Sequence, residues 1–182
     1  MIPWEVITIS EQKRYGKIED TIVKMLDGEL QKNALRFVDD LNENKLSLIP
    51  LPYEMDNGET IGYKIPYNGH YLGWMLIKKS GEWCVQIFNY LDFGKRIHSD
   101  EKDEEFKKAV YDHVKICGTP CHDECWRAKD VKIFGKEFKS VCSQHSCDFV
   151  NPDDKTIAQL MRLIDYSKQT KPYAQQYHPN FL

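Results

Sequence analysis

Apolar side chains recur at helical spacing in the N-terminal part of the chain. Ile18, Ile22 and Met25 lie four and three residues apart, which predicts a helix over residues 15–27. A second stripe with the same spacing follows Gly28 and consists of Leu30, Ala34, Phe37, Val38 and Leu41. Because the glycine interrupts the pattern, the two stripes predict either two helices or one helix with a bend.

Alternating apolar and polar residues replace this spacing further along the chain. The alternation predicts strands at 60–66, 71–78 and 82–90. Ser80-Gly81 separates the last two and marks the clearest hairpin. The segment 45–52 also alternates, but its two prolines restrict it to an edge strand or a loop. We therefore expect an antiparallel meander of three or four strands over residues 46–90.

A run of acidic residues, 100–105, opens the C-terminal half. Carboxylates are favourable near the N-terminus of a helix, so the run predicts that a helix begins here. Phe106, Val110 and Val114 continue one apolar stripe, which extends to Cys117. The helix is therefore expected to carry Cys117 on its buried face.

Two more elements are predicted beyond this helix. Residues 131–138 alternate and predict a two-stranded ribbon that turns at Gly135-Lys136. Asn151 and Pro152 precede two aspartates, a typical helix start with the asparagine as cap and the proline in the first helical position. The buried stripe of this last helix consists of Ile157, Leu160, Met161 and Ile164.

Five of the six cysteines lie between residues 117 and 147. Three of them recur at intervals of four around Gly118 and Pro120, where the chain must bend, and a fourth follows the ribbon. Thiolates that converge from a bent loop and a ribbon can complete a tetrahedral Zn²⁺ site. The predicted ligands are Cys117, Cys121, Cys125 and Cys142. The substitutes are Cys147, His122, His145 and His113.

Other uses of the cysteines stay open. Structural zinc sites usually place two residues between paired cysteines, whereas this chain has three. Disulfides belong to secreted proteins, and the N-terminus lacks the features of a signal peptide. An Fe–S centre of the radical-enzyme type needs a different spacing and a larger barrel. Unligated buried thiols are the remaining alternative.

These patterns predict an α+β protein. N-terminal helices pack on an antiparallel meander sheet in residues 1–100, and a zinc-bound helical module follows in residues 101–168. The polar segment 169–182, with its spaced aromatic residues, forms a tail. We expect the whole to be one compact domain.

Charge and motifs limit the function classes. The net charge of −3 and the pI of about 6.1 exclude a global basic field for nucleic acid. Nothing approaches the apolar length of a membrane span. Phosphate-binding glycine loops and hydrolase or kinase signatures are absent. We expect a cytoplasmic, non-catalytic protein; a nucleophilic Cys84 or Cys147 beside His145 is the enzymatic alternative.

The region from Cys117 to about residue 167 resembles a cysteine-bearing C-terminal module of uncharacterised small bacterial and phage-borne proteins. The shared features are the spaced cysteines, the ribbon sequence 133–138, Val141-Cys142 and the helix start at 151–153. This resemblance implies a metal-bound module and assigns no activity. By type, in size, acidity and lack of catalytic signatures, the chain is also similar to anti-CRISPR inhibitors of Cas9.

The resulting hypothesis is a phage or mobile-element inhibitor in a bacterial host cell. It would dock on a basic, nucleic-acid-handling protein such as Cas9, with acidic side chains facing the channel for DNA or RNA. Aromatic side chains of the meander would hold the complex. The predicted contact residues are Glu101, Glu104, Glu105, Asp39, Asp40, Trp74 and Trp83. Further acidic candidates are Glu43, Asp100 and Asp103.

Two other function classes stay open. One is a DNA-binding transcriptional regulator that uses a basic patch on the zinc module, formed by Lys129, Lys132, Lys136 and Lys139. The other is a small-molecule-binding or enzymatic domain that uses the aromatic sheet. Salt-dependent binding to duplex DNA would favour the first, and a deep pocket with convergent polar groups would favour the second.

Overall fold

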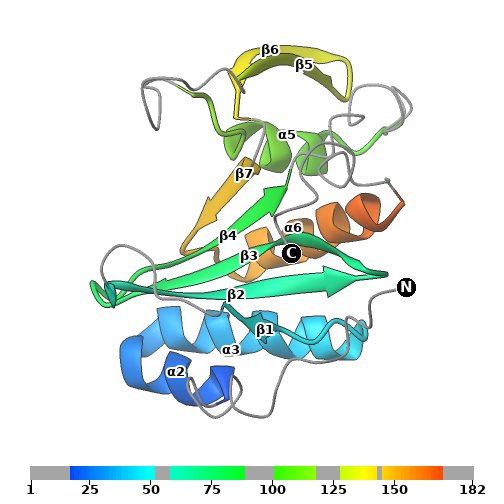
Figure 1. Ribbon diagram of the computed structural model, residues 1–182. Coiled ribbons are helices and arrows are strands. Elements are labelled where there is room, and N and C mark those ends of the chain that lie inside the picture. The colour runs from blue at the N-terminus through cyan, green and yellow to red at the C-terminus, as the bar shows by residue number, and fades with distance from the viewer. Residues whose placement is uncertain (1–16, 52–57, 89–100, 118–127, 143–144, 170–182) are drawn as a thin grey trace. The chain divides into compact units, whose positions relative to one another are not determined.

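The computed structural model describes residues 17–51, 58–88, 101–117, 128–142 and 145–169 (Figure 1). The elements are α2 (Ile18–Met25), α3 (Gly28–Glu43), β1 (Ile49–Pro50), β2 (Thr60–Tyr67), β3 (His70–Lys78), β4 (Trp83–Phe88), α5 (Glu104–Asp112), β5 (Lys129–Ile133), β6 (Lys136–Val141), β7 (His145–Val150) and α6 (Asp154–Lys168). One sheet has the order β1-β2-β3-β4-β7, and β5 and β6 form a separate ribbon. The predicted α+β class is confirmed.

The chain divides into two compact units that are discontinuous in sequence. Unit 1 consists of Met1–Val85 and Val150–Ile157, and unit 2 consists of Gln86–Phe149 and Ala158–Leu182. Within the described residues, no helix is long and apolar enough to cross a bilayer.

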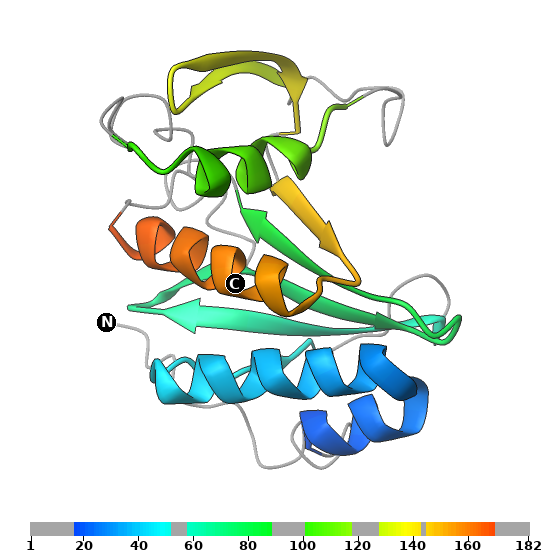
Figure 2. The same cartoon turned by 180° about the vertical axis from the view of Figure 1, so that it is seen from behind.

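In unit 1 the helices α2 and α3 lie along one face of the sheet (Figure 2). Gly28 begins α3 with a positive φ of 51°, which separates the helices, so the two-helix alternative is correct. The predicted stripe of α3 is buried at Ala34, Phe37, Val38 and Leu41. Tyr63 of β2 donates a buried hydrogen bond of 2.7 Å to Thr21 of α2. This bond satisfies two polar groups inside an otherwise apolar contact.

The predicted meander is confirmed over β1 to β4. The strands β2 and β3 pair antiparallel, with Tyr63 opposite Met75 on one face and Lys64 opposite Trp74 on the other. The strand β1 has only two residues and pairs at the edge of β2, as its prolines predict. The sheet face that holds Tyr63 is therefore the one that packs on the helices.

Asn151 connects the end of β7 to the start of β4. Its side-chain oxygen accepts a hydrogen bond of 2.9 Å from Trp83 N, and its own N–H donates one of 2.9 Å to Trp83 O. The residue has a φ of 45°, a region that asparagine tolerates better than most residues. Its predicted role as helix cap is wrong. Asp153 is positioned to cap α6 instead, because its carboxylate accepts from Thr156 N at 2.8 Å.

In unit 2 the helix α5 is shorter than the sequence predicts. Asp103 caps it by accepting hydrogen bonds from the N–H groups of Glu105 and Phe106, and the helix ends at Asp112. The expected helical position of Cys117 is therefore wrong. The residues before this cysteine are extended: Val114 lies opposite Cys147, and Ile116 lies opposite Val141. These β-branched residues favour extended backbone, which explains the early end of the helix.

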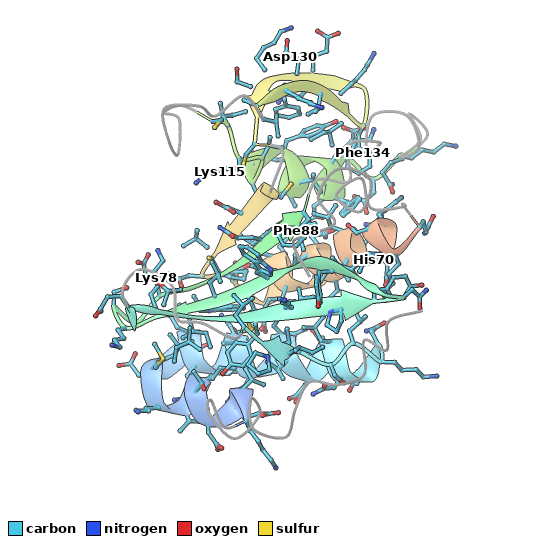
Figure 3. All side chains as sticks on the ribbon, in the orientation of Figure 1. His70, Lys78, Phe88, Lys115, Asp130 and Phe134 are labelled. Atoms are coloured by element: carbon cyan, nitrogen blue, oxygen red, sulfur yellow. The ribbon has the colours of Figure 1, made fainter. Side chains whose placement is uncertain are left out.

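The ribbon β5–β6 covers α5 (Figure 1). Its turn is at Phe134-Gly135, one residue earlier than predicted, and both turn residues have positive φ values of 44° and 85°. That combination matches the twist of paired strands. Phe134 is buried next to α5, whereas Asp130 lies on the opposite side of the ribbon (Figure 3).

The strand β7 and part of the α6 stripe differ from the prediction. No strand was expected at 145–150, and β7 is present there because it finds partners in β4 and in the extended residues after α5. In α6 the predicted Ile157, Leu160 and Ile164 are buried, but Leu163 is buried in place of Met161. The C-terminal module is thus built from strands as well as helices.

Candidate functional site

Val141 at the end of β6 is paired on both sides. It lies opposite Lys129 of β5 in the ribbon and opposite Ile116 in an antiparallel bridge. Ile116 and Lys129, which lie on either side of residues 118–127 in the sequence, therefore both pair with the same residue. This pairing fixes the two ends of the segment close together, so the entropy cost of closing it does not have to be met by a ligand.

Two of the predicted metal ligands lie on this ladder next to Val141. Cys117 donates its backbone N–H to Ser140 O at 2.7 Å, and Cys142 donates its N–H to Lys115 O at 2.9 Å. Cys117 and Cys142 are thus diagonal neighbours across the ladder, a relation that separates Cα atoms by about 7–8 Å. That separation is too long for a direct disulfide between them. It suits two ligands of one metal ion, which meet at the ion rather than at each other.

The other half of the predicted quartet, Cys121 and Cys125, lies outside the described residues, as does His122. Within the part of the chain that the structure describes, no three His, Cys, Asp or Glu side chains are grouped to hold a metal ion. The backbone of His145 begins β7.

The substitutes Cys147 and His113 both lie in unit 2, Cys147 in its core and His113 half-buried. Cys147 is only 2% exposed, and its backbone lies opposite Val114. His113 stacks on Phe149 with ring centroids 4.3 Å apart, and its Nδ1 lies 2.7 Å from Ala109 O. A carbonyl only accepts, so Nδ1 is the donor in this hydrogen bond.

An ion pair lies beside the two ladder cysteines. Lys115 Nζ is 3.0 Å from Asp148 Oδ2, and the carboxylate is 15% exposed. Its other oxygen is buried and has no hydrogen-bond partner among the described residues. The lysine ammonium is therefore the main compensation for a largely buried negative charge, which makes the pair sensitive to loss of either member.

The predicted acidic surface before α5 is engaged within unit 2. Glu101 is 11% exposed and accepts from Arg162 at 3.3 Å and from the Tyr166 hydroxyl. The Tyr166 hydrogen bond is the main reason that the pKa of Glu101 lies below its usual value. Asp103 accepts from Arg162 at 2.6 Å while capping α5, and the backbone N–H of Phe106 lowers the pKa of Asp103. Glu101 is therefore largely buried, whereas Asp103 is 42% exposed and already paired with Arg162.

Asp100 lies outside the described residues, and the remaining predicted acidic residues are exposed or half-buried. Glu104 forms an ion pair of 2.8 Å with Lys107. Glu105 is exposed and also takes part in a polar or electrostatic interaction. Asp39 is exposed on α3, whereas Asp40 is half-buried with its carboxylate 3.9 Å from Arg36.

The two predicted aromatic contacts differ in burial. Trp83 is completely buried and packs on Phe37 with ring centroids 5.9 Å apart. A side chain in that place cannot touch a partner, so its assignment to a binding surface is replaced by a role in the core. Trp74 is half-buried. It pairs with Lys64 across the strands, on the face of the sheet that does not hold Tyr63.

The four lysines of the ribbon do not form an uninterrupted basic patch. Lys132 lies opposite Glu137, and Lys139 forms an ion pair of 2.8 Å with Asp130. Lys136 lies over the ring of Tyr111 at 4.8 Å. Alternating signs on an exposed ribbon weaken the field that nucleic-acid binding requires. Lys129 is exposed at the start of β5.

Sequence reasoning missed the Glu101–Arg162–Tyr166 group and the Trp83–Asn151 pair. Both join residues more than sixty positions apart, which no local spacing reports. No protein-family model matches the chain, and comparison with curated proteins and with solved structures finds no similar protein.

Proposed function

We propose that the chain is a zinc-stabilised, non-enzymatic binding protein that docks on a basic, nucleic-acid-handling protein such as Cas9. The observation that carries the docking proposal is the last turn of α3. Asp39, Asp40 and Glu43 lie there, and no basic residue does. The C-terminus of a helix favours cations, so these carboxylates are placed where they cost stability.

The cost is greatest for Asp39 and Glu43. Both are exposed, and within the described residues neither takes part in an ion pair. They are four residues apart on the helix, a spacing at which like charges repel. A basic partner would remove both penalties at once. The acidic residues of unit 2 offer less, because Arg162 already neutralises two of them.

The zinc proposal rests on the double pairing of Val141. Two predicted ligands, Cys117 and Cys142, flank this residue on the ladder. Cys121 and Cys125 lie in the sequence between Ile116 and Lys129, the two residues that pair with Val141. Four thiolates from these positions would fill a closed tetrahedral site of the structural kind. Such a metal would link the segment of Cys121 and Cys125 to the ribbon and stabilise unit 2.

Purified protein is therefore expected to contain about one zinc ion per chain. Cys117→Ser and Cys142→Ser should each lower the zinc content strongly, because one ligand of a four-thiolate site is lost. Elemental analysis of protein purified without added metal measures this directly. In hydrogen exchange, residues 113–117 and 136–142 should lose protection first when a chelator is added.

Cys84→Ser is the matched control for the zinc experiment. Cys84 is as buried as Cys142 but lies on β4 in unit 1. This variant should keep its zinc. Protein that contains neither zinc nor iron, or equal metal loss in the Cys84 variant, would contradict the proposed site.

The double substitution Asp39→Lys/Glu43→Lys is expected to separate stability from binding. It should raise the free energy of unfolding by about 0.5–1 kcal/mol, because lysines suit the C-terminal end of α3. It should also slow association with a Cas9–guide complex by tenfold or more at low salt, since electrostatic attraction acts mainly on association. Urea unfolding and surface-based binding kinetics measure the two effects.

The control for charge alone is Glu59→Lys/Glu82→Lys, which changes the net charge equally within unit 1. These carboxylates form ion pairs with Lys79 and Lys78 and lie outside the helices. Their substitution therefore changes the net charge without changing the charge at a helix end. Cleavage of a target plasmid by Cas9, with and without an equimolar amount of the protein, tests inhibition itself. Undiminished cleavage across several Cas9 types, with no effect of the α3 substitutions on any basic partner, would retire the proposal.

A further inference from the structure

A closed group of polar and aromatic side chains lies at the start of α5 in unit 2. Glu101 Oε1 accepts from Asp103 N at 2.9 Å, which folds the residues before the helix back on themselves. Glu101 Oε2 accepts from Arg162 and from the Tyr166 hydroxyl, both on α6. One carboxylate thus connects two elements that are otherwise separate in sequence.

The aromatic rings fix the geometry of this group. Arg162 lies over the ring of Phe106, with its guanidinium carbon 4.1 Å from the ring centroid. Phe106 stacks on Tyr166 with centroids 5.5 Å apart and planes 14° apart. The rings hold the guanidinium and the phenol in the positions from which both donate to Glu101.

We propose that Glu101, Arg162 and Tyr166 form an acid-released latch that fixes the start of α5 to the C-terminal half of α6. The latch is closed while Glu101 is a carboxylate, because its Oε2 then accepts charge-assisted hydrogen bonds from Arg162 and from the Tyr166 hydroxyl. Protonation weakens both and opens the contact. The other charged groups near Glu101 are Asp103, which shares Arg162, and Lys107, which pairs with Glu104.

The pKa shifts of Glu101 and Tyr166 give the direction of the pH effect. The pKa of Glu101 is lowered, first by the Tyr166 hydrogen bond, and the pKa of Tyr166 is raised by the same bond. A group whose pKa is lowered on folding stabilises the fold above its unfolded pKa, here about 4.3. That stabilisation is lost as the pH falls through the lower, folded pKa. The latch therefore stays closed at neutral pH and opens in acid, as the pH falls through the lowered pKa of Glu101.

Hydrogen exchange at pH 6 and pH 3.5, corrected for the intrinsic pH dependence of exchange, tests the latch. In the unmodified protein, exchange in the first turn of α5 and around residues 162–166 should be about tenfold faster at the lower pH. Glu101→Gln should give the faster rates already at pH 6 and respond little to further acidification. Tyr166→Phe should behave similarly, because it removes one donor to Glu101 and leaves the Asp103 cap intact.

Glu104→Gln is the matched control, since Glu104 lies three residues after Glu101, at the start of α5, but its carboxylate is 81% exposed and pairs with Lys107. It should keep the pH response of the unmodified protein. A Glu101→Gln protein with the unmodified pH response would overturn the proposal, because the response would then come from Asp103. Loss of the response in Glu104→Gln would overturn it too.

Discussion

Trp83→Ala is expected to lower the free energy of unfolding by about 3–5 kcal/mol. The indole is fully buried in unit 1 and contacts Phe37 of α3, so its removal leaves a cavity between helix and sheet. Urea unfolding of the two proteins measures the loss. Trp83→Phe should cost much less, because it keeps most of the volume and removes an indole N–H that is buried without a partner in the described part of the chain.

Trp74→Ala is the internal comparison for this prediction. Trp74 lies on the neighbouring strand but is only half-buried, so less apolar area is lost when it is truncated. Its cost should be less than half of that of Trp83→Ala. Equal costs for the two truncations would contradict the assignment of Trp83 to the core.

Phe106→Ala should have an effect of similar size in unit 2. The ring is fully buried. Its centroid lies 5.4 Å from that of Phe134 and 5.5 Å from that of Tyr166, and the Arg162 guanidinium lies over its face. Its loss removes the contact that α5, the ribbon turn and α6 share. We expect about 3–5 kcal/mol, toward the upper end because aromatic pairs add to the area term.

Phe138→Ala is the control for Phe106→Ala. Phe138 is half-buried on the ribbon, and its ring centroid lies 5.5 Å from that of Tyr111. Its truncation should cost clearly less in the same denaturant measurement. If it cost more, the centre of unit 2 would lie under the ribbon rather than at Phe106.

The elements that depend on local spacing were predictable. The stripe of α3 and the hairpin of β3 and β4 need only a window of about fifteen residues, and both are present as expected. The end of α5 was not, because the apolar stripe continues in register to Cys117 while tertiary pairing of Val114 and Ile116 overrides it. Asn151 was misassigned for the same reason: its partner is Trp83, not the following helix.

In the candidate sites, too, local sequence features were predictable and contacts between distant residues were not. Composition locates acidic residues, but whether Glu101 faces solvent or Arg162 depends on a contact across sixty positions of sequence. The cysteine spacing predicts metal ligands at Cys117 and Cys142, and it gives no indication that Val141 pairs with both Ile116 and Lys129. Burial of Trp83 was equally out of reach, because an aromatic strand residue is compatible with either face of a sheet.

The pair of hydrogen bonds between Trp83 and Asn151 also constrains the order of events during synthesis. The two residues are 68 positions apart, and the ribbon and α5 are translated between them. The nascent chain therefore cannot complete unit 1 until the first segment of unit 2, Gln86–Phe149, has left the ribosome. The hairpins β2–β3 and β5–β6 need only local contacts and can form earlier. Until Asn151 emerges, the β4 edge of unit 1 stays open to intermolecular pairing, which is the period when a chaperone would protect it best.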